Sequence, residues 1–223
     1  CVLQKKNTNS QIKNMKKKTL LVLAVCMGLA ATATAQELRY GIIGGYNLNS
    51  SVANFSKSSF HAGFRGEYAF SDASKGLYTD FGLILSSKGW KSTWYYDQTK
   101  SMQWECTPYY LNIPVHLGYK FRVNDNLSIF ADAGPYFNFG AFGKMKQISA
   151  PSGGKETVTT TSKNVFKDNL VEIFDYGAGF RAGVELVRHL QVGIGYDWAF
   201  KSPYKDISNT KHRTLVVSCS YLF

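Results

Sequence analysis

Hydrophobic and polar residues alternate along the segment 174–200, on both sides of a break at 187–189. Even-numbered positions are apolar or aromatic, and odd-numbered positions hold mainly glycine and charged or polar residues. Side chains alternate between the two faces of a strand, so this period of two predicts two long strands joined by a short turn. Each run approaches the ~9–11 residues that a tilted strand needs to cross a bilayer. A hairpin of a soluble sandwich would also have one apolar face, but the length and the aromatic ends favour a membrane barrel.

The same alternation recurs along the chain and predicts eight strands. The expected ranges are 38–48, 59–70, 77–90, 107–121, 127–142, 174–186, 190–200 and 213–223. Pro114 lies inside the fourth range and removes a donor from the hydrogen-bond ladder, so we expect a bulge or a local bend there. Eight is an even number, as a closed antiparallel bacterial barrel requires.

Short and long connections alternate between these strands. The short ones are 71–76, 123–126 and 187–189, and the long, polar ones are 49–58, 91–106, 143–173 and 201–212. Outer-membrane barrels have short periplasmic turns and longer extracellular loops. The sequence therefore predicts an all-β, eight-stranded antiparallel up-and-down transmembrane β-barrel in the cell outer membrane, with both termini periplasmic.

Two of the long connections have distinctive compositions. In 143–173, the Thr157–Thr161 run is compatible either with a hairpin that extends two strands beyond the membrane or with a flexible surface loop. Aromatic residues crowd the second connection, where we favour an outer interfacial girdle over a binding surface. They are Trp90, Trp94, Tyr95, Tyr96, Trp104, Tyr109 and Tyr110.

The beginning of the chain has the pattern of a secretory signal peptide. Three lysines follow Met15, an apolar stretch covers 19–31, and Ala33-Thr34-Ala35 forms a cleavage site before Gln36. A lipoprotein signal at Cys26 is disfavoured, because the bulky Val25 precedes it and the apolar stretch continues beyond it. We expect residues 1–14 to be an upstream extension of the gene start, 15–35 the signal peptide, and 36–223 the barrel domain.

Charge and cysteines exclude several classes of function. Six lysines and no acid lie in residues 1–35, so the export segment supplies much of the formal charge of +11. This weakens the case for a function in nucleic-acid binding. Cys106 and Cys219 fall at opposite ends of the predicted barrel, so we expect no disulfide between them. No spacing indicates a metal site, and we expect no cofactor.

The predicted lumen is narrow and polar. An eight-stranded barrel is just wide enough for side chains to fill it. We expect a structural plug of ion pairs, because unpaired buried charges are costly; a proton or ion path is the alternative. The predicted polar network consists of Arg65, Glu67, Asp80, Asp132, Asp175, Arg181, Glu185 and Asp197, and parity also directs Arg39, Lys88, His116 and Lys120 inward.

Catalytic signals are missing from the sequence. The histidines are His61, His116, His189 and His212, and none has a serine motif nearby. We find no nucleophile elbow, zinc-protease motif or phosphate-binding glycine loop. We therefore predict that the protein is not an enzyme and name no catalytic residue.

Several blocks resemble the PorT-like family of outer-membrane β-barrel proteins. The most specific is Tyr110-Leu111-Asn112-Ile113-Pro114-Val115, which is similar to the family's Tyr-Leu-Glu-Ile-Pro-Leu strand, with Asn112 in place of the acid. Further matches, in the right order, are Gly134-Pro135-Tyr136, Phe174-Asp175-Tyr176-Gly177 with Gly183-Val184-Glu185, and Thr210-Lys211-His212-Arg213 leading to Tyr221-Leu222-Phe223.

This resemblance implies a small eight-stranded barrel and a role close to surface-protein secretion. Tyr221 and the terminal Phe223 resemble the membrane-insertion signal that the barrel-assembly machinery reads. We expect a structural or interaction role in secretion or envelope maintenance. The expected partners are outer-membrane lipid and a surface or secretion-system protein bound through the long loops, with no nucleic acid. The alternatives are a narrow channel for small solutes or ions and a lipid-modifying outer-membrane enzyme.

Overall fold

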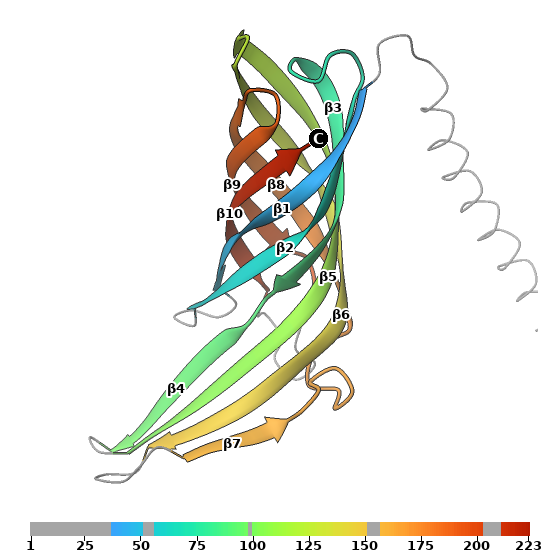
Figure 1. Cartoon of the computed structure of the whole chain (residues 1–223). Helices are drawn as coiled ribbons and strands as arrows, with labels where there is room; N and C mark the ends of the chain where they lie inside the picture. The colour runs from blue at the N-terminus through green and yellow to red at the C-terminus, as the bar shows by residue number, and fades with distance from the viewer. Residues whose placement is uncertain (1–36, 51–55, 98–99, 151–156, 203–210) are drawn as a thin grey trace, which may run out of the picture. The chain divides into compact units, whose positions relative to one another are not determined.

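The computed structural model describes residues 37–50, 56–97, 100–150, 157–202 and 211–223, and the predicted signal peptide and its cleavage site lie outside them. The described residues form ten strands (Figure 1). They are β1 (Glu37–Ser50), β2 (Ser56–Ala69), β3 (Gly76–Ser87), β4 (Trp90–Asp97), β5 (Lys100–Asn124), β6 (Leu127–Ala150), β7 (Thr157–Ser162), β8 (Phe174–Leu186), β9 (Leu190–Ala199) and β10 (Arg213–Leu222). Within these ranges no helix is long and apolar enough to cross a membrane.

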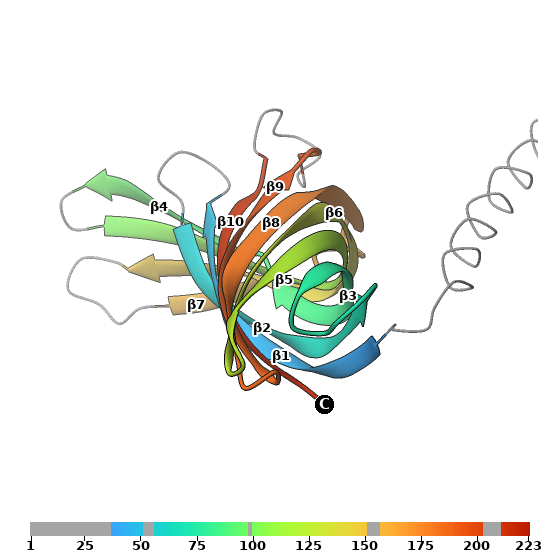
Figure 2. The ribbon, with the colours of Figure 1, turned by 90° about the horizontal axis from the view of Figure 1, so that it is seen from above.

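Eight of the strands close into a ring. Their order is β5-β3-β2-β1-β10-β9-β8-β6, and pairing of β5 with β6 completes the circle. All pairings are antiparallel, and the first strand of the ring pairs with the last (Figure 2). The predicted eight-stranded antiparallel barrel is confirmed. Closure removes the two open sheet edges, whose unpaired backbone groups would be costly in an apolar surrounding.

The two faces of the ring differ as the alternation predicts. On β1, Leu38 and Tyr40 are exposed while Arg39 and Asn47 are buried inside. An outward apolar band of this kind fits a lipid surrounding, because such a surface in water would be unfavourable. Other exposed members of this band include Phe60, Phe64, Leu83, Leu117, Tyr119, Ile129, Phe180, Ile194 and Val217.

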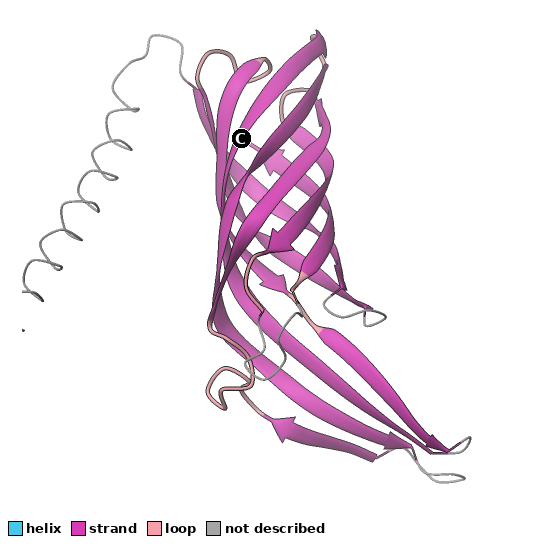
Figure 3. Cartoon of the chain, turned by 180° about the vertical axis from the view of Figure 1, so that it is seen from behind, coloured by secondary structure: helices cyan, strands magenta, loops and turns pink. Residues whose placement is uncertain are grey.

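Two ring strands, β5 and β6, continue beyond the ring, and with β4 and β7 they form a four-stranded part of the same sheet (Figures 1 and 3). The extensions of β5 and β6 pair with each other, β4 pairs along β5, and β7 pairs along β6. We call this sheet of β4, β7 and the adjoining parts of β5 and β6 the extension. Much of the connections expected at 91–106 and 143–173 is therefore strand. Of the two possibilities for the Thr157–Thr161 run, the paired strand is found: β7 pairs with the extended β6, but residues 163–173 separate β7 from β8, so the second of the two strands is not extended.

Of the bulge or local bend expected at Pro114, the bulge is not present. Pairing of β3 with β5 is interrupted opposite Pro114 but resumes in the same register, and so does pairing of β5 with β6. A register shift occurs instead between Tyr109 and Tyr110. The missing donor thus costs local pairs without changing the alignment of the strands.

A small apolar cluster lies where the ring ends and the extension begins. Cys106 and Tyr110 of β5 pack against Val165, Phe166 and Val171 of the segment that follows β7. We call the segment 163–173 the cap. The Tyr110 ring meets Phe166 edge-on at a centroid distance of 5.3 Å and is fully buried. The expectation that Tyr110 belongs to an interfacial girdle is therefore wrong.

Tyr109, in contrast, points the other way and stacks on Phe142 at 4.8 Å. Trp90 is partly buried against the apolar cluster. The side chains of Trp94, Tyr95 and Tyr96 lie outside the described residues. Cys106 and Cys219 are both free thiols, the first buried and the second exposed.

Candidate functional site: the barrel lumen

Near the short turns, two carboxylates share two cations. Arg39 contacts Glu67 at 2.5 Å and Glu185 at 2.9 Å, and Lys120 contacts the same two residues at 2.6 and 2.5 Å. Gln191 donates to Glu67 at 3.0 Å and to Glu185 at 2.6 Å. All five side chains are almost completely buried. The two positive and the two negative charges balance here, as burial requires.

The turn between β2 and β3 closes this end. Arg39 and Lys120 donate to the Ala73 carbonyl at 3.2 and 3.1 Å, and Ala73 is buried. Beside it, Asp72 accepts hydrogen bonds from Ser74. Arg122 Nη2 also donates to both carboxylate oxygens of Asp72, at 2.8 and 2.7 Å. Partial burial raises the pKa of Asp72, but the bonds from Ser74 and Arg122 outweigh it and lower this pKa to about 2.

A second group lies around Asp132. Arg181 binds Asp132 at 2.8 Å and Asp80 at 3.0 Å, and Arg65 also binds Asp80. Asp132 further accepts from the Tyr78 hydroxyl at 2.6 Å and contacts His116 Nδ1 at 2.8 Å. Residues from β2, β3, β5, β6 and β8 are thereby tied across the lumen.

Toward the extension, Lys88 lies 3.8 Å from Asp175 and 4.3 Å from the centroid of the Tyr136 ring. Asn138 donates to Asp175 at 3.0 Å, and Asn112 donates to Asn138 at 2.7 Å. The cation–π contact and the amide chain link this group to both β5 and β6.

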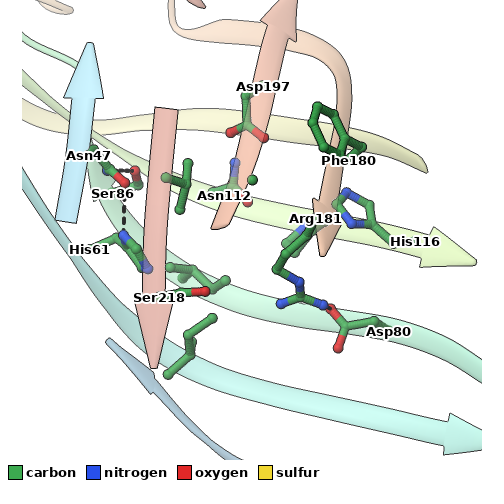
Figure 4. A pocket seen from close by; sticks show the side chains of 15 residues that line it. Asn47, His61, Asp80, Ser86, Asn112, His116, Phe180, Arg181, Asp197 and Ser218 are labelled. Atoms are coloured by element: carbon green, nitrogen blue, oxygen red, sulfur yellow. Dashed lines mark hydrogen bonds and ion pairs between the residues drawn. The ribbon is translucent and has the colours of Figure 1, made fainter. Parts of the chain in front are cut away.

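A cavity of about 70 Å³ lies inside the ring (Figure 4). We call it the chamber. Its polar walls come from seven of the eight ring strands, with Asp197 and His116 among them (Figure 4). The lining residues are Ile43, Asn47, His61, Asp80, Ile84, Ser86, Asn112, Pro114, His116, Phe180, Arg181, Gly195, Asp197, Val216 and Ser218.

The sequence-predicted network residues all lie inside the ring, but they differ in their contacts. Arg65, Glu67, Asp80, Asp132, Asp175, Arg181 and Glu185 each take part in an ion pair. Asp197 has no hydrogen bond or ion pair to another described residue. Sequence reasoning missed Tyr78 and Gln191, although their parity places both side chains inward.

One arrangement in the chamber resembles part of a hydrolase site. His61 Nδ1 lies 2.8 Å from Asn47 Oδ1, and Ser218 lines the same space. No hydrogen bond joins Ser218 to His61 among the described residues, so a nucleophile activated by its base is not assembled. The described residues also form no group of three or more side chains that could hold a metal ion.

Comparison with known proteins identifies the family. The family model for the outer membrane protein beta-barrel domain matches residues 32–204. The chain belongs to this family. A search of the curated proteins found no match.

Several solved outer-membrane barrels are similar in fold. The attachment invasion locus protein Ail of Yersinia pestis is 15% identical, with 84% of this chain and 99% of that chain covered and a TM-score of 0.33. Neisserial surface protein A is 11% identical, with 85% and 99% covered and a TM-score of 0.43. The outer membrane enzyme PagL is 11% identical, with 83% and 99% covered and a TM-score of 0.35. At these identities no role is transferred from them.

Proposed function

We propose that this outer-membrane barrel has a structural and interaction role: it anchors the extension outside the membrane, where the extension contacts a surface or secretion-system protein. The observation that carries the proposal is the four-stranded sheet itself. It continues directly from β5 and β6, so it is held by strands that also form the barrel wall. A sheet anchored in this way is pre-ordered, which lowers the entropic cost of binding a partner.

The filled lumen supports a role that is not transport. The Ala73 turn packs at one end, the apolar cluster with the cap packs at the other, and ion pairs join strands across the space between them. The proposal includes a non-catalytic role. The features that support the proposal are a projecting sheet and a lumen crossed by ion pairs, and neither is a catalytic arrangement. The resemblance to the PorT-like family supports a role in surface-protein secretion or envelope maintenance.

The proposed orientation follows from the connections. Short turns and both termini lie on the periplasmic side, and the extension lies outside the cell. Tyr221 and Phe223 are exposed on the outer face of the last strand, where the barrel-assembly machinery would read them. Outer-membrane lipid then surrounds the apolar band.

Site-directed photo-crosslinking tests the proposal. A photoreactive residue at Val158, which is exposed on β7, should capture a discrete envelope or surface protein in intact cells. The matched control is Asp125, exposed in the short turn between β5 and β6 at the opposite end. Capture at both positions, or at neither, would argue against a partner that binds the extension.

A narrow channel is the second candidate, and the chamber is the observation that favours it. Conduction would require water to connect the chamber with both ends, past the Asp132 and Glu67 groups. Planar-bilayer recording decides between the two. A steady single-channel current that changes when Arg65 or Asp132 is replaced would reject the plug, whereas a silent membrane would exclude the channel.

A further inference from the structure

The lumen holds one more carboxylate than it holds lysines and arginines. Within the described residues, the buried cations of the ring are Arg39, Arg65, Lys88, Lys120 and Arg181. Five carboxylates are buried with them, namely Glu67, Asp80, Asp132, Asp175 and Glu185, and a sixth, Asp197, is half-buried and lines the chamber. A carboxylate without a counter-charge in a narrow, half-enclosed lumen is unfavourable, so a further positive charge beside it is stabilising.

Asp197 is the carboxylate left over. The other five each contact a lysine or arginine, while Asp197 faces the chamber without such a contact. The titratable and charged groups that face it are Lys88 between β3 and β4, His116 of β5, Tyr136 of β6, and Asp175 and Arg181 of β8. Arg181 already binds Asp80 and Asp132, and the charge of Lys88 is matched by Asp175 at 3.8 Å, although Lys88 Nζ has no hydrogen bond. His116 is the remaining group that can take up a charge.

The hydrogen bonds assign the free nitrogen of His116. Its Nδ1 lies 2.8 Å from Asp132 Oδ1, and a carboxylate oxygen accepts, so Nδ1 carries the hydrogen. Nε2 therefore has a lone pair, and it is buried with no hydrogen-bond partner. His61 repeats this arrangement, with Nδ1 toward Asn47 Oδ1 and an unpartnered Nε2. Each of these two histidines, both among the residues that line the chamber, thus has one buried acceptor without a donor.

A glycine makes room for Asp197 and His116 to face the same space. A Cβ at Gly179 would lie 2.5 Å from Asp197 Oδ1 and 3.6 Å from His116 Cε1. The chamber also has room for water, since a water molecule occupies about 30 Å³ of liquid and needs two to four polar partners. With 70 Å³ and these acceptors, water can connect the two groups.

We propose that the chamber binds one proton, shared by Asp197 and His116 through water. This proton supplies the missing positive charge and the missing donor together. A metal ion is a weaker solution, because the described residues gather no three ligating side chains. The proposal concerns the barrel lumen and is independent of any partner on the extension.

The test measures how stability depends on pH. The native state holds one proton that an ionised aspartate and a neutral histidine in the unfolded chain lack, so stability falls as pH rises. Heat-modifiability of the full-length protein in detergent gives the unfolding midpoint between about pH 7 and about pH 9. The wild-type midpoint should fall, relative to Asp197→Asn, by roughly 3–5 °C for each pH unit.

Asp175→Asn is the matched control, since it makes the same chemical change at an acid that has a cation beside it. Its midpoint should be lower at every pH, with the wild-type slope retained. Equal slopes for wild type and Asp197→Asn would overturn the proposal. A midpoint that follows sodium concentration at fixed pH would also overturn it, in favour of a bound metal cation.

Spectroscopy on the folded wild type gives a readout that does not depend on the variants. Infrared spectra should contain the carbonyl band of a protonated carboxylic acid, or ¹⁵N NMR should show a doubly protonated His116 ring. Asp197→Asn should remove the signal that is observed. An ionised Asp197 together with a neutral His116 at about pH 7 would reject the proposal.

Discussion

Glycines on the inner face of the strands stand opposite the bulkiest side chains of the lumen. A Cβ at Gly118 would come within 2.5 Å of the Tyr78 ring and 2.6 Å of the Asp132 Cβ. A Cβ at Gly177 would come within 2.5 Å of the Tyr136 hydroxyl. Inward glycines therefore do not mark an open pore. They provide the space in which a narrow barrel packs tyrosine, arginine and carboxylate side chains.

Replacing Glu67 should destabilise the barrel strongly. Glu67→Gln leaves Arg39 and Lys120 with only Glu185 as a carboxylate partner, and both cations stay buried. We expect a loss of about 3–5 kcal/mol in the free energy of unfolding, measured by denaturant titration in detergent or vesicles. Glu37→Gln, at an exposed position at the start of β1, should have little effect. Similar losses for both variants would contradict the ion-pair account.

Asp72 should contribute stability only above acidic pH. Its pKa is lowered to about 2 in the folded protein, against about 4 in an unfolded chain. A lowered folded pKa means that the contribution is fully present above about pH 4 and is lost as pH falls toward about 2. The stability difference between wild type and Asp72→Asn should follow this window in urea midpoints. Asp125→Asn, in an exposed turn, serves as the control, and a constant difference would contradict the prediction.

Among the elements, β5 and β6 decide what the molecule presents outside the barrel. They have 25 and 24 residues, far more than the other ring strands. The cap folds back onto this pair, with Phe166 over Gly140 and Val165 over Gly143. Close approach at both positions requires that the strand residue has no side chain. The extension and the cap therefore form one packed unit with the mouth of the ring.

Truncating Phe166 should loosen the cap without unfolding the ring. The ring of Phe166 is 5% exposed and packs on Tyr110, so Phe166→Ala removes contacts worth about 3–5 kcal/mol. Limited proteolysis within the cap should become faster by roughly two to four orders of magnitude. Lys167→Ala, an exposed neighbour in the same segment, should leave the cleavage rate unchanged. Equal rates in the two variants would show that the cluster does not hold the cap.

At the scale of the whole molecule, closure depends on the chain ends. β1 and β10 pair over ten positions, from Gly41↔Leu222 to Ser50↔Arg213. Phe223 N–H then donates to the Tyr40 carbonyl at 2.8 Å. The ring can close only when both β1 and β10 are present. The C-terminal residues therefore take part in the last step of barrel assembly, the pairing of β10 with β1.

Phe223→Ala should therefore reduce assembly more than stability. The variant keeps the backbone bond to Tyr40 but loses an exposed aromatic ring that contacts Tyr221 at 5.4 Å. We expect a lower fraction of heat-modifiable, membrane-inserted protein in cells, and a nearly normal unfolding midpoint for the protein that has folded. Phe200→Ala removes a similarly exposed ring just beyond β9 and should insert normally. Equal insertion of both variants would remove Phe223 from the insertion signal.

The sequence alone determined the ring. Its period of two defined eight strands and the inward or outward direction of their side chains, because a residue's face in a strand depends only on its position along the chain. The inward position of Asp132, Glu67 and Asp197 follows from that rule. So does the outward position of Tyr109 beside the inward Tyr110.

Only the tertiary structure decided which lumen groups meet and how the long connections fold. Asp132 receives Arg181 while Asp197 receives no cation, because partners across a barrel depend on strand stagger and tilt, which local periodicity does not encode. Likewise Tyr110 is buried by a cap more than fifty residues later in the chain. Its burial and the chamber both arise from packing between distant segments, and no pattern within a single strand specifies that.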